Sequence, residues 1–303
     1  MRALALVVLA LAACTKPQPA APPALKAATQ TLLSTSAQAL LPDADDAAAL
    51  LDLGRGQVVF EHHAEVLRRH AMPPGSVMKL VTAYALFEAG QVDSPYVCRG
   101  EHVDRFGQRR TCWNHEGHGE VRLRTALALS CNVWFYAHAS AVRPERFQEI
   151  AAELGIDGIP GQVPEEEVPD LLVGDHVGLR VTPLSLLRAV TVIATRGYRI
   201  EPSFSAPSPR VLVHLDPRAF DLLALGMEEA TRSGTLEGAL PVEVAAKTGT
   251  APRPGTRGTR GFVVGYFPAQ APRYAFVVVK DHGRGAHDAA PFARVMAAAL
   301  GAR

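Results

Sequence analysis

Three short segments of this chain combine residue types that can carry out nucleophilic catalysis. A serine hydroxyl is a poor nucleophile until a neighbouring base takes its proton, and an uncharged lysine amine can serve as that base. In chain order the segments are Ser76-Val77-Met78-Lys79, Ser130-Cys131-Asn132 and Lys247-Thr248-Gly249-Thr250. Together they supply a nucleophile, a base, a proton relay and a cation for a carboxylate. The set predicts an enzyme that forms an acyl-serine intermediate.

The first segment predicts the nucleophile and its base. Proline and glycine at 73–75 break the chain before Ser76, so we expect this serine at the start of a helix. Lys79 then lies one turn further along the same face. Its amine must be uncharged to accept a proton. Burial lowers the pKa of a lysine, and a second cation, for which Lys247 is the candidate, lowers it further. Unpaired N–H groups at the helix start favour a developing oxyanion.

The second segment lies within an apolar helical stretch. Ser130 and Asn132 are two positions apart and do not share a face of a regular helix. A turn between two helices would let both side chains point into one cleft. There Ser130 would relay a proton to the leaving amine, and Asn132 would hold the substrate amide.

The third segment ends an extended run, and a strand edge can pair with an extended peptide. Gly249 has no side chain, which would let the substrate backbone lie close. Lys247 and Thr250 offer a cation and a hydroxyl to a terminal carboxylate, and the N–H of Thr250 would be a second oxyanion donor. We therefore expect a substrate-binding strand here.

Apolar patterns predict the elements that position these segments. The expected elements are a hairpin at 47–60, a helix at 79–88, helical stretches at 123–139, 144–154 and 183–195, strands at 242–250, 261–267 and 274–280, and a closing helix at 291–300. Strands, then helices, then strands again predict an α/β (α+β) fold in which helices surround a mixed sheet.

The first residues predict export and lipidation. Met1-Arg2 precedes an apolar run at 3–13 that is too short to span a bilayer and has the layout of a secretory signal. Residues 11–14 resemble a bacterial lipobox, in which the cysteine carries lipid chains that anchor it to a membrane. The predicted parts are a lipoprotein signal peptide at 1–13, a lipidated Cys14 with a Pro/Ala-rich linker over 14–35, and a folded domain at 36–303. An ordinary signal peptide with an incidental cysteine is the alternative.

The three segments, with further blocks, make the chain similar to the transpeptidase domain of class B penicillin-binding proteins over residues 45–300. The further blocks are Tyr96-Val97-Cys98-Arg99-Gly100, Cys112-Trp113, Gly117-His118-Gly119, Phe135-Tyr136, Gly174-Asp175 and Val181-Thr182-Pro183-Leu184. The resemblance implies a central, mainly antiparallel sheet flanked by helices, a helical subdomain at about 90–200, and an active site between them. A short linker would replace the family's pedestal and membrane helix, and Val177-Gly178-Leu179-Arg180 replaces its Gly-Gln-Gly block.

The resemblance also implies an activity and partners. Ser76 would be acylated by D-Ala-D-Ala stem peptides during peptidoglycan cross-linking, in a D,D-transpeptidase reaction without a cofactor. Thr248, Gly249 and Thr250 would bind the donor strand and the carboxylate of β-lactams. Expected partners are peptidoglycan, β-lactams, a bacterial membrane (inner or outer) through the lipid, and cell-wall synthesis proteins. The net charge of +1 gives no reason to expect nucleic acid.

Three other functions stay open. A D,D-carboxypeptidase would differ only in using water as the acceptor. A serine β-lactamase would need a carboxylate to activate a deacylating water, and Glu165-Glu166-Glu167 stands roughly where one would lie. Asp170 stands where such enzymes have an asparagine, so we expect a solvated acidic loop instead. The third alternative is a non-catalytic lipoprotein that senses β-lactams or muropeptides.

The remaining cysteines predict a disulfide. In an exported protein Cys98 and Cys112 would pair by default, which stabilises by about 3 kcal/mol. Zinc held by some of Cys98, Cys112, His115 and His118 is the alternative, but their spacing fits no strong zinc pattern, and we expect no metal. Cys131 is expected to be a small buried residue beside the site.

Overall fold

The computed structural model describes residues 25–302. The predicted signal peptide, the lipidated Cys14 and the first part of the linker lie outside the described residues. Within the described part, no helix is both long and apolar enough to cross a membrane.

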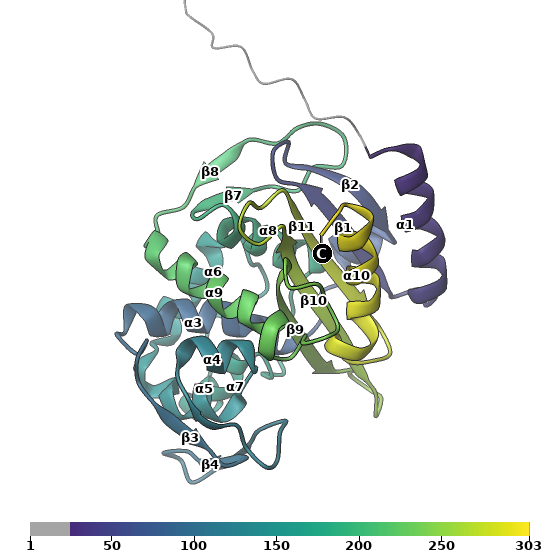
Figure 1. Ribbon diagram of the computed structural model, residues 1–303. Helices are drawn as coiled ribbons and strands as arrows, with labels where there is room; N and C mark the ends of the chain where they lie inside the picture. The colour runs from purple at the N-terminus through teal and green to yellow at the C-terminus, as the bar shows by residue number, and fades with distance from the viewer. Residues whose placement is uncertain (1–24, 303) are drawn as a thin grey trace, which may run out of the picture.

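A five-stranded antiparallel sheet forms the centre of the molecule (Figure 1). Its order is β2-β1-β11-β10-β9, so β9 is an edge strand. The strands are β1 (Ala47–Asp52), β2 (Gln57–His62), β9 (Ala245–Pro252), β10 (Thr259–Phe267) and β11 (Tyr274–Lys280). All four neighbouring pairs are antiparallel. This confirms the predicted fold class and the strands expected around the third segment.

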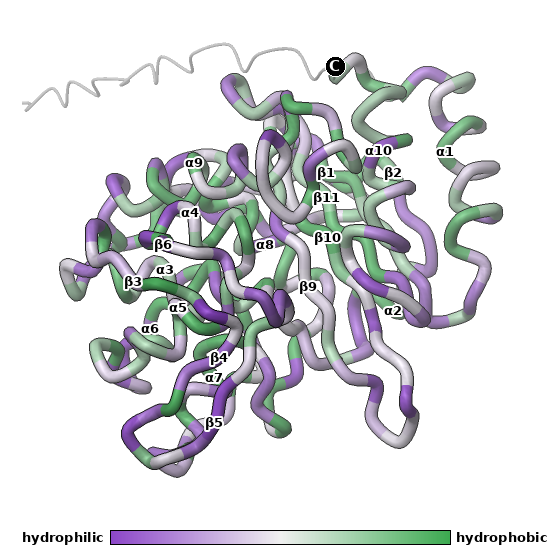
Figure 2. Tube along the Cα trace, turned by 60° about the horizontal axis from the view of Figure 1, so that its bottom comes forward, coloured by the Kyte–Doolittle hydropathy of each residue, from purple (hydrophilic) through white to green (hydrophobic). Residues whose placement is uncertain are grey.

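Both faces of the sheet are covered, because the apolar residues of its middle strands alternate between two cores. On β11, Val277 and Val279 belong to one core and Phe276 and Val278 to the other. Helices α1 (Ala27–Leu40) and α10 (Ala290–Ala299) cover one face, and α8 (Pro183–Ala194) with α9 (Pro217–Ser233) covers the other, beside α2 (Ala64–Arg69) (Figure 1). Figure 2 shows the apolar central strands enclosed between these helices.

A helical lobe lies beyond the β9 side of the sheet (Figure 1). Its helices are α3 (Lys79–Glu88), α4 (Leu123–Ala128), α5 (Asn132–His138), α6 (Pro144–Glu153) and α7 (Val168–Val173), with the short turns η1 (Gly75–Met78), η2 (Ala139–Ala141) and η3 (Glu165–Glu167). Two small hairpin-like sheets pair β3 (Tyr96–Cys98) with β6 (Gly119–Val121) and β4 (Glu101–Val103) with β5 (Arg109–Thr111). The β4–β5 end is hydrophilic in Figure 2. A further pair, β7 (Tyr198–Ile200) and β8 (Arg210–Leu212), lies beside α8, and the π-helical turn η4 (Gly285–Ala289) precedes α10.

The start of the folded domain differs from the prediction. Helix α1 begins at Ala27, inside the segment expected to be a linker to residue 35. Leu33 and Ala37, four positions apart, are fully buried in the core that also contains Phe292. The Pro-rich composition ends at Pro23, and the apolar spacing after it is helical. Helix α9 was not predicted from the sequence either, although its N-cap Asp216 and first-turn Pro217 are a standard helix start.

Candidate active site

Ser76 lies where the turn before α3 meets the edge strand β9. It belongs to η1, directly ahead of Lys79 at the start of α3. Gly75 has φ +55°, and a Cβ there would lie 2.5 Å from the carbonyl oxygen of Thr250. The close approach therefore requires glycine at this position. It confirms that the first and third segments meet.

The structure gives a different reason for a glycine at position 249 from the one expected from the sequence. A Cβ at this position would lie 2.6 Å from the carbonyl oxygen of Pro74 and 2.8 Å from a methyl carbon of Val77. Gly249 is thus buried against the turn that carries the serine, and a side chain would push the strand away from it. Its missing side chain makes room for the protein's own backbone.

Lys79 is completely buried, and its amine contacts the second segment. Nζ donates to the backbone oxygen of Ser130 at 2.9 Å, to Oγ of Ser130 at 3.5 Å, and to Oδ1 of Asn132. Three acceptors match the three N–H bonds of an ammonium group. The Asn132 amide is also held from its other end, because Nδ2 donates to the carbonyl oxygen of Thr111 at 3.3 Å.

Ser130 lies in a tight turn between α4 and α5, as predicted. Its backbone is left-handed with φ +52°, which ends α4 and turns the chain into α5. Its hydroxyl lies between two lysines: Nζ of Lys247 donates to Oγ at 2.8 Å, opposite Lys79. Lys247 is also fully buried, and its other acceptor is the backbone oxygen of Thr248 at 2.8 Å. All three segments therefore converge on the oxygen of one serine.

Protonating both lysines is unfavourable, because both amines are buried away from water and lie near each other. Burial lowers the pKa of Lys79 to about 8, a shift that the charges of Asp175, Cys131 and Cys112 oppose. The pKa of Lys247 is lowered well below its ordinary value, first by burial and then by the charge of Lys79. Burial therefore favours the uncharged form of both amines, and an uncharged Lys79 can accept a proton. The sequence analysis expected burial to lower the pKa of Lys79, and the structure shows that burial does so.

This balance gives a pH dependence for any reaction in which Lys79 accepts a proton. With a pKa of about 8, roughly a tenth of the Lys79 amine is uncharged at pH 7 and most of it at pH 9. We expect acylation of the serine to become about tenfold faster between these two pH values. Stopped-flow measurement of acylation rates from pH 6.5 to 9.5 checks this. A rate that stays flat or falls over this range would contradict it.

One cavity of about 420 Å³ brings most of the predicted site residues together. Five of them line it: Ser76, Ser130, Asn132, Thr248 and Thr250. Lys79 and Lys247 lie buried behind them. The wall also contains residues that the sequence analysis did not assign to the site, namely Trp113, Asp175, Thr235, Arg284, Ala286 and His287. Trp113 and Asp175 lie in the blocks that carry the family resemblance, which was the available signal for them.

The threonines of β9 are held in place by neighbouring segments. The hydroxyl of Thr248 donates to that of Thr235 at 3.2 Å, and the hydroxyl of Thr250 accepts from the backbone N–H of Gly285 at 3.3 Å. Asp175 is exposed to the solvent of the cleft, yet enough protein surrounds it to raise its pKa, an effect that the charge of Lys79 opposes. The cleft thus presents hydroxyls, an amide, a carboxylate and cations.

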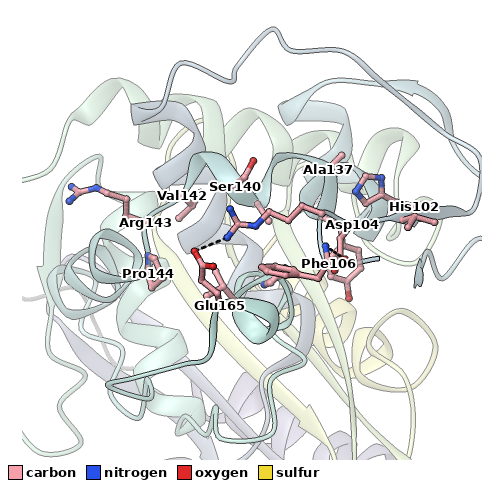
Figure 3. Close-up of a pocket in the computed structure, with 15 residues that line it drawn as sticks. His102, Asp104, Phe106, Ala137, Ser140, Val142, Arg143, Pro144 and Glu165 are labelled. Carbon is pink, nitrogen blue, oxygen red and sulfur yellow. Dashed lines mark hydrogen bonds and ion pairs between the residues drawn. The ribbon is translucent and has the colours of Figure 1, made fainter. Parts of the chain in front are cut away.

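The acidic segment at 165–167 lies away from this cleft. Glu165 lines a second cavity, of about 470 Å³, where it forms an ion pair of 3.0 Å with Arg105 (Figure 3). Glu167 contacts Nε2 of His176 at 2.9 Å. None of the three glutamates is among the described residues that line the cavity with Ser76. Asp170, behind them, is paired with Arg110 at 2.6 Å. The expectation of an acidic loop with no part in a deacylating site is therefore supported.

The predicted disulfide is not present. Cys98, Cys112 and Cys131 are buried free thiols. The sulfur atoms of Cys98 and Cys112 lie 3.6 and 3.5 Å from the same atom, Nδ1 of His118. One imidazole nitrogen thus contacts two of the three thiols, and all three of these residues are among the alternative zinc ligands named from the sequence.

Comparison with known proteins agrees with this geometry. The family "Penicillin binding protein transpeptidase domain" matches residues 62–298. The chain is 25% identical, over 253 residues, to the peptidoglycan D,D-transpeptidase PbpA of Mycobacterium tuberculosis, covering 70% of this chain and 50% of the relative. It is 23% identical to the peptidoglycan D,D-transpeptidase MrdA of Acinetobacter baumannii, covering 73% and 41%.

The fold is shared with solved structures. The transpeptidase domain of penicillin-binding protein 3 from Burkholderia pseudomallei superposes with a TM-score of 0.75 at 22% identity, covering 91% of this chain and 94% of that one. The chain spans about half the length of the curated relatives it matches first. The matched family covers most of the chain and includes all three segments that meet at the cleft. The chain therefore belongs to the family of penicillin-binding protein transpeptidase domains.

Proposed function

We propose that this protein is a penicillin-binding D,D-transpeptidase that forms an acyl-serine on Ser76. The observation that carries the proposal is the position of the Ser130 hydroxyl between Nζ of Lys79 and Nζ of Lys247, at the wall of the cavity that Ser76 lines. Two buried amines on either side of one hydroxyl form a path for protons. Burying two lysine amines next to each other costs free energy. A role in proton transfer explains this cost, whereas a role in packing alone does not.

The acylation step follows from this arrangement. Oγ of Ser76 attacks the carbonyl carbon of the penultimate D-Ala, and uncharged Lys79 takes the hydroxyl proton. The backbone N–H groups of Ser76 and Thr250 stabilise the oxyanion. The C–N bond then breaks as Ser130 passes its proton to the leaving D-Ala amine, and Lys79 returns to Ser130 the proton it took from Ser76. An acceptor amine from a second stem peptide attacks the ester and gives a proton to uncharged Lys79. The new amide bond forms as the ester C–O bond breaks, and Lys79 returns the proton to the oxygen of Ser76.

Substrate binding uses the edge of the sheet. β9 pairs with β10 on one side only, so its other edge can add the extended donor peptide as a further strand. The terminal carboxylate would lie at Thr248, Thr250 and Lys247. A carboxylate bound there would favour the charged form of Lys247, whose pKa is lowered by burial and by the charge of Lys79. Binding and charge on this lysine are therefore coupled.

The cellular setting forms part of the proposal. We propose an exported protein, held at a bacterial membrane by lipid on Cys14 and acting on the cell wall. Its assigned parts would be a signal peptide at 1–13, a tether up to about residue 26 and the transpeptidase domain from there on. Among structures of similar fold is a complex between penicillin-binding protein 2 and MreC from Helicobacter pylori. By analogy, cell-wall synthesis proteins are proposed partners of this chain.

Labelling with a fluorescent penicillin over time tests the proposed class. The cleft contains no glutamate from 165–167 among its described lining residues, so we expect slow deacylation. Label should persist for hours, as in a penicillin-binding protein. Loss of the label within seconds would identify a β-lactamase and contradict the proposal. Transfer to an added D-amino acid or glycine acceptor, measured against simple release of D-Ala from a donor peptide, separates transpeptidation from carboxypeptidation.

A further inference from the structure

Four side chains that commonly bind metal ions meet beside the active site. They are Cys98 at the end of β3, Cys112 after β5, His118 before β6, and Cys131 between α4 and α5. Their ligand atoms all lie within 4.8 Å of one another. Four separate segments of the lobe therefore deliver one ligand each to the same point.

The distances suit a tetrahedral ion. Zinc binds thiolate sulfur at about 2.3 Å and imidazole nitrogen at about 2.0–2.1 Å, which separates a sulfur and a nitrogen on one tetrahedral ion by about 3.5 Å. Nδ1 of His118 lies 3.6 Å from Sγ of Cys98 and 3.5 Å from Sγ of Cys112. The backbone is arranged to hold this spacing, because the N–H of His118 donates to the carbonyl oxygen of Cys98 at 3.1 Å.

The four side chains are not a chance cluster on the protein surface, because their ligand atoms are buried. The exposed fractions of Cys98, Cys112 and Cys131 are 2%, 1% and 0%. Nε2 of His118 is buried too, and it has no hydrogen-bond partner among the described residues. Apolar packing alone gives no reason to collect three sulfur atoms around one imidazole nitrogen. Three soft sulfur ligands and one imidazole nitrogen, with no open position, are the donor set of a structural zinc site.

We propose that Cys98, Cys112, His118 and Cys131 bind one zinc ion, and that this ion fixes the active-site turn. Cys131 stands between Ser130 and Asn132, the two residues that contact Lys79. Of the other three ligands, Cys98 ends strand β3, and Cys112 and His118 directly adjoin β5 and β6 of the small sheets. The metal would therefore tie these sheets to the turn that presents Ser130 and Asn132 to the cleft. Removal of the metal leaves the turn attached only through its protein contacts.

The site also accounts for the absence of a Cys98–Cys112 disulfide. Coordination occupies both sulfur atoms, so an exported protein can keep these thiols reduced in an oxidising compartment. From the sequence we expected no metal, because the spacing fits no strong zinc pattern, and we expected Cys131 to be a small buried residue. In the structure, Cys131 replaces His115 in the ligand set that the sequence suggested.

Elemental analysis of the purified full chain tests the proposal directly. We expect close to one zinc per chain in the wild-type protein and in a His115→Ala control, whose side chain is exposed and outside the cluster. His118→Ala and Cys98→Ser should lose most of the metal. Cobalt substitution should give the intense visible absorption of a tetrahedral thiolate site. Wild-type protein without bound metal, or with a Cys98–Cys112 disulfide found by mass spectrometry, would overturn the zinc site.

The positioning role has its own readout. Removal of zinc by a strong chelator should slow penicillin acylation about 10- to 100-fold, the usual effect of losing the support around a site, and re-addition of zinc should restore it. Acylation that is unchanged in the zinc-free protein would overturn this role while leaving the metal site itself intact. Because metal content is measured without penicillin, failure of the proposed enzyme function cannot be mistaken for failure of the site.

Discussion

Ser76→Ala is expected to abolish covalent labelling by penicillin and release of D-Ala from donor peptides. The substitution removes the only atom that we propose to form the ester, and loss of the nucleophile in a serine hydrolase lowers turnover by about 10⁶-fold. The hydrogen bonds among Lys79, Ser130 and Lys247 do not involve Ser76, so they should survive the change. In-gel fluorescence and donor-peptide turnover measure the effect.

Folding must be separated from chemistry in that experiment. Ser140→Ala is a matched control, since Ser140 is an exposed serine that lines the second cavity. This variant should label like the wild type, and both variants should melt at the wild-type temperature. Labelling of Ser76→Ala at the wild-type level would assign the nucleophile to another residue.

Lys79→Met is expected to slow acylation by about 10²- to 10⁴-fold, the usual contribution of a general base. Methionine preserves much of the buried apolar volume but cannot accept the serine proton. The increase of the rate with pH through about 8 should disappear with the amine that causes it. Acylation rates over pH, with binding of penicillin measured separately, distinguish loss of the base from loss of affinity.

Lys79→Met is also expected to lower the stability of the protein, and this effect must be measured separately from the loss of the base. It leaves Oδ1 of Asn132 and the backbone oxygen of Ser130 without their donor, and each unsatisfied buried acceptor costs about 1–3 kcal/mol. Thermal unfolding measures this cost, and Lys26→Met, at an exposed lysine ahead of α1, controls for loss of a lysine as such. A stable Lys79→Met variant that keeps both the wild-type rate and its pH profile would exclude Lys79 as the base.

Local sequence patterns were sufficient to predict most of the helices and strands that hold the active-site residues. Strand β11 and helix α3 lie at their predicted positions, because β-branched runs and helical apolar spacing leave little choice locally. The turn at Ser130 was also predictable, since Ser130 and Asn132 cannot share a face of one helix. Many of the polar residues at the cleft lie in the three segments that the sequence analysis singled out.

Properties that depend on distant parts of the chain could not be predicted. Arg284 and His287 reach the cleft from the turn before α10, which carries no motif. The role of Gly249 became apparent only when Pro74 was found against it. The sequence grouped Cys98, Cys112 and His118 as possible zinc ligands, but it gave no sign that Cys131 joins them. The pKa values of Lys79 and Lys247 depend on how completely the fold buries each amine.

Mapping the acylated residue in the wild-type protein tests the proposed nucleophile most directly. Penicillin-treated protein is digested and its peptides are identified by tandem mass spectrometry. We predict one adduct, on Ser76, in the peptide that also contains Lys79 or ends at it. An adduct on Ser130, on a cysteine of the cluster or on any other side chain would contradict the assignment of the nucleophile and the mechanism built on it.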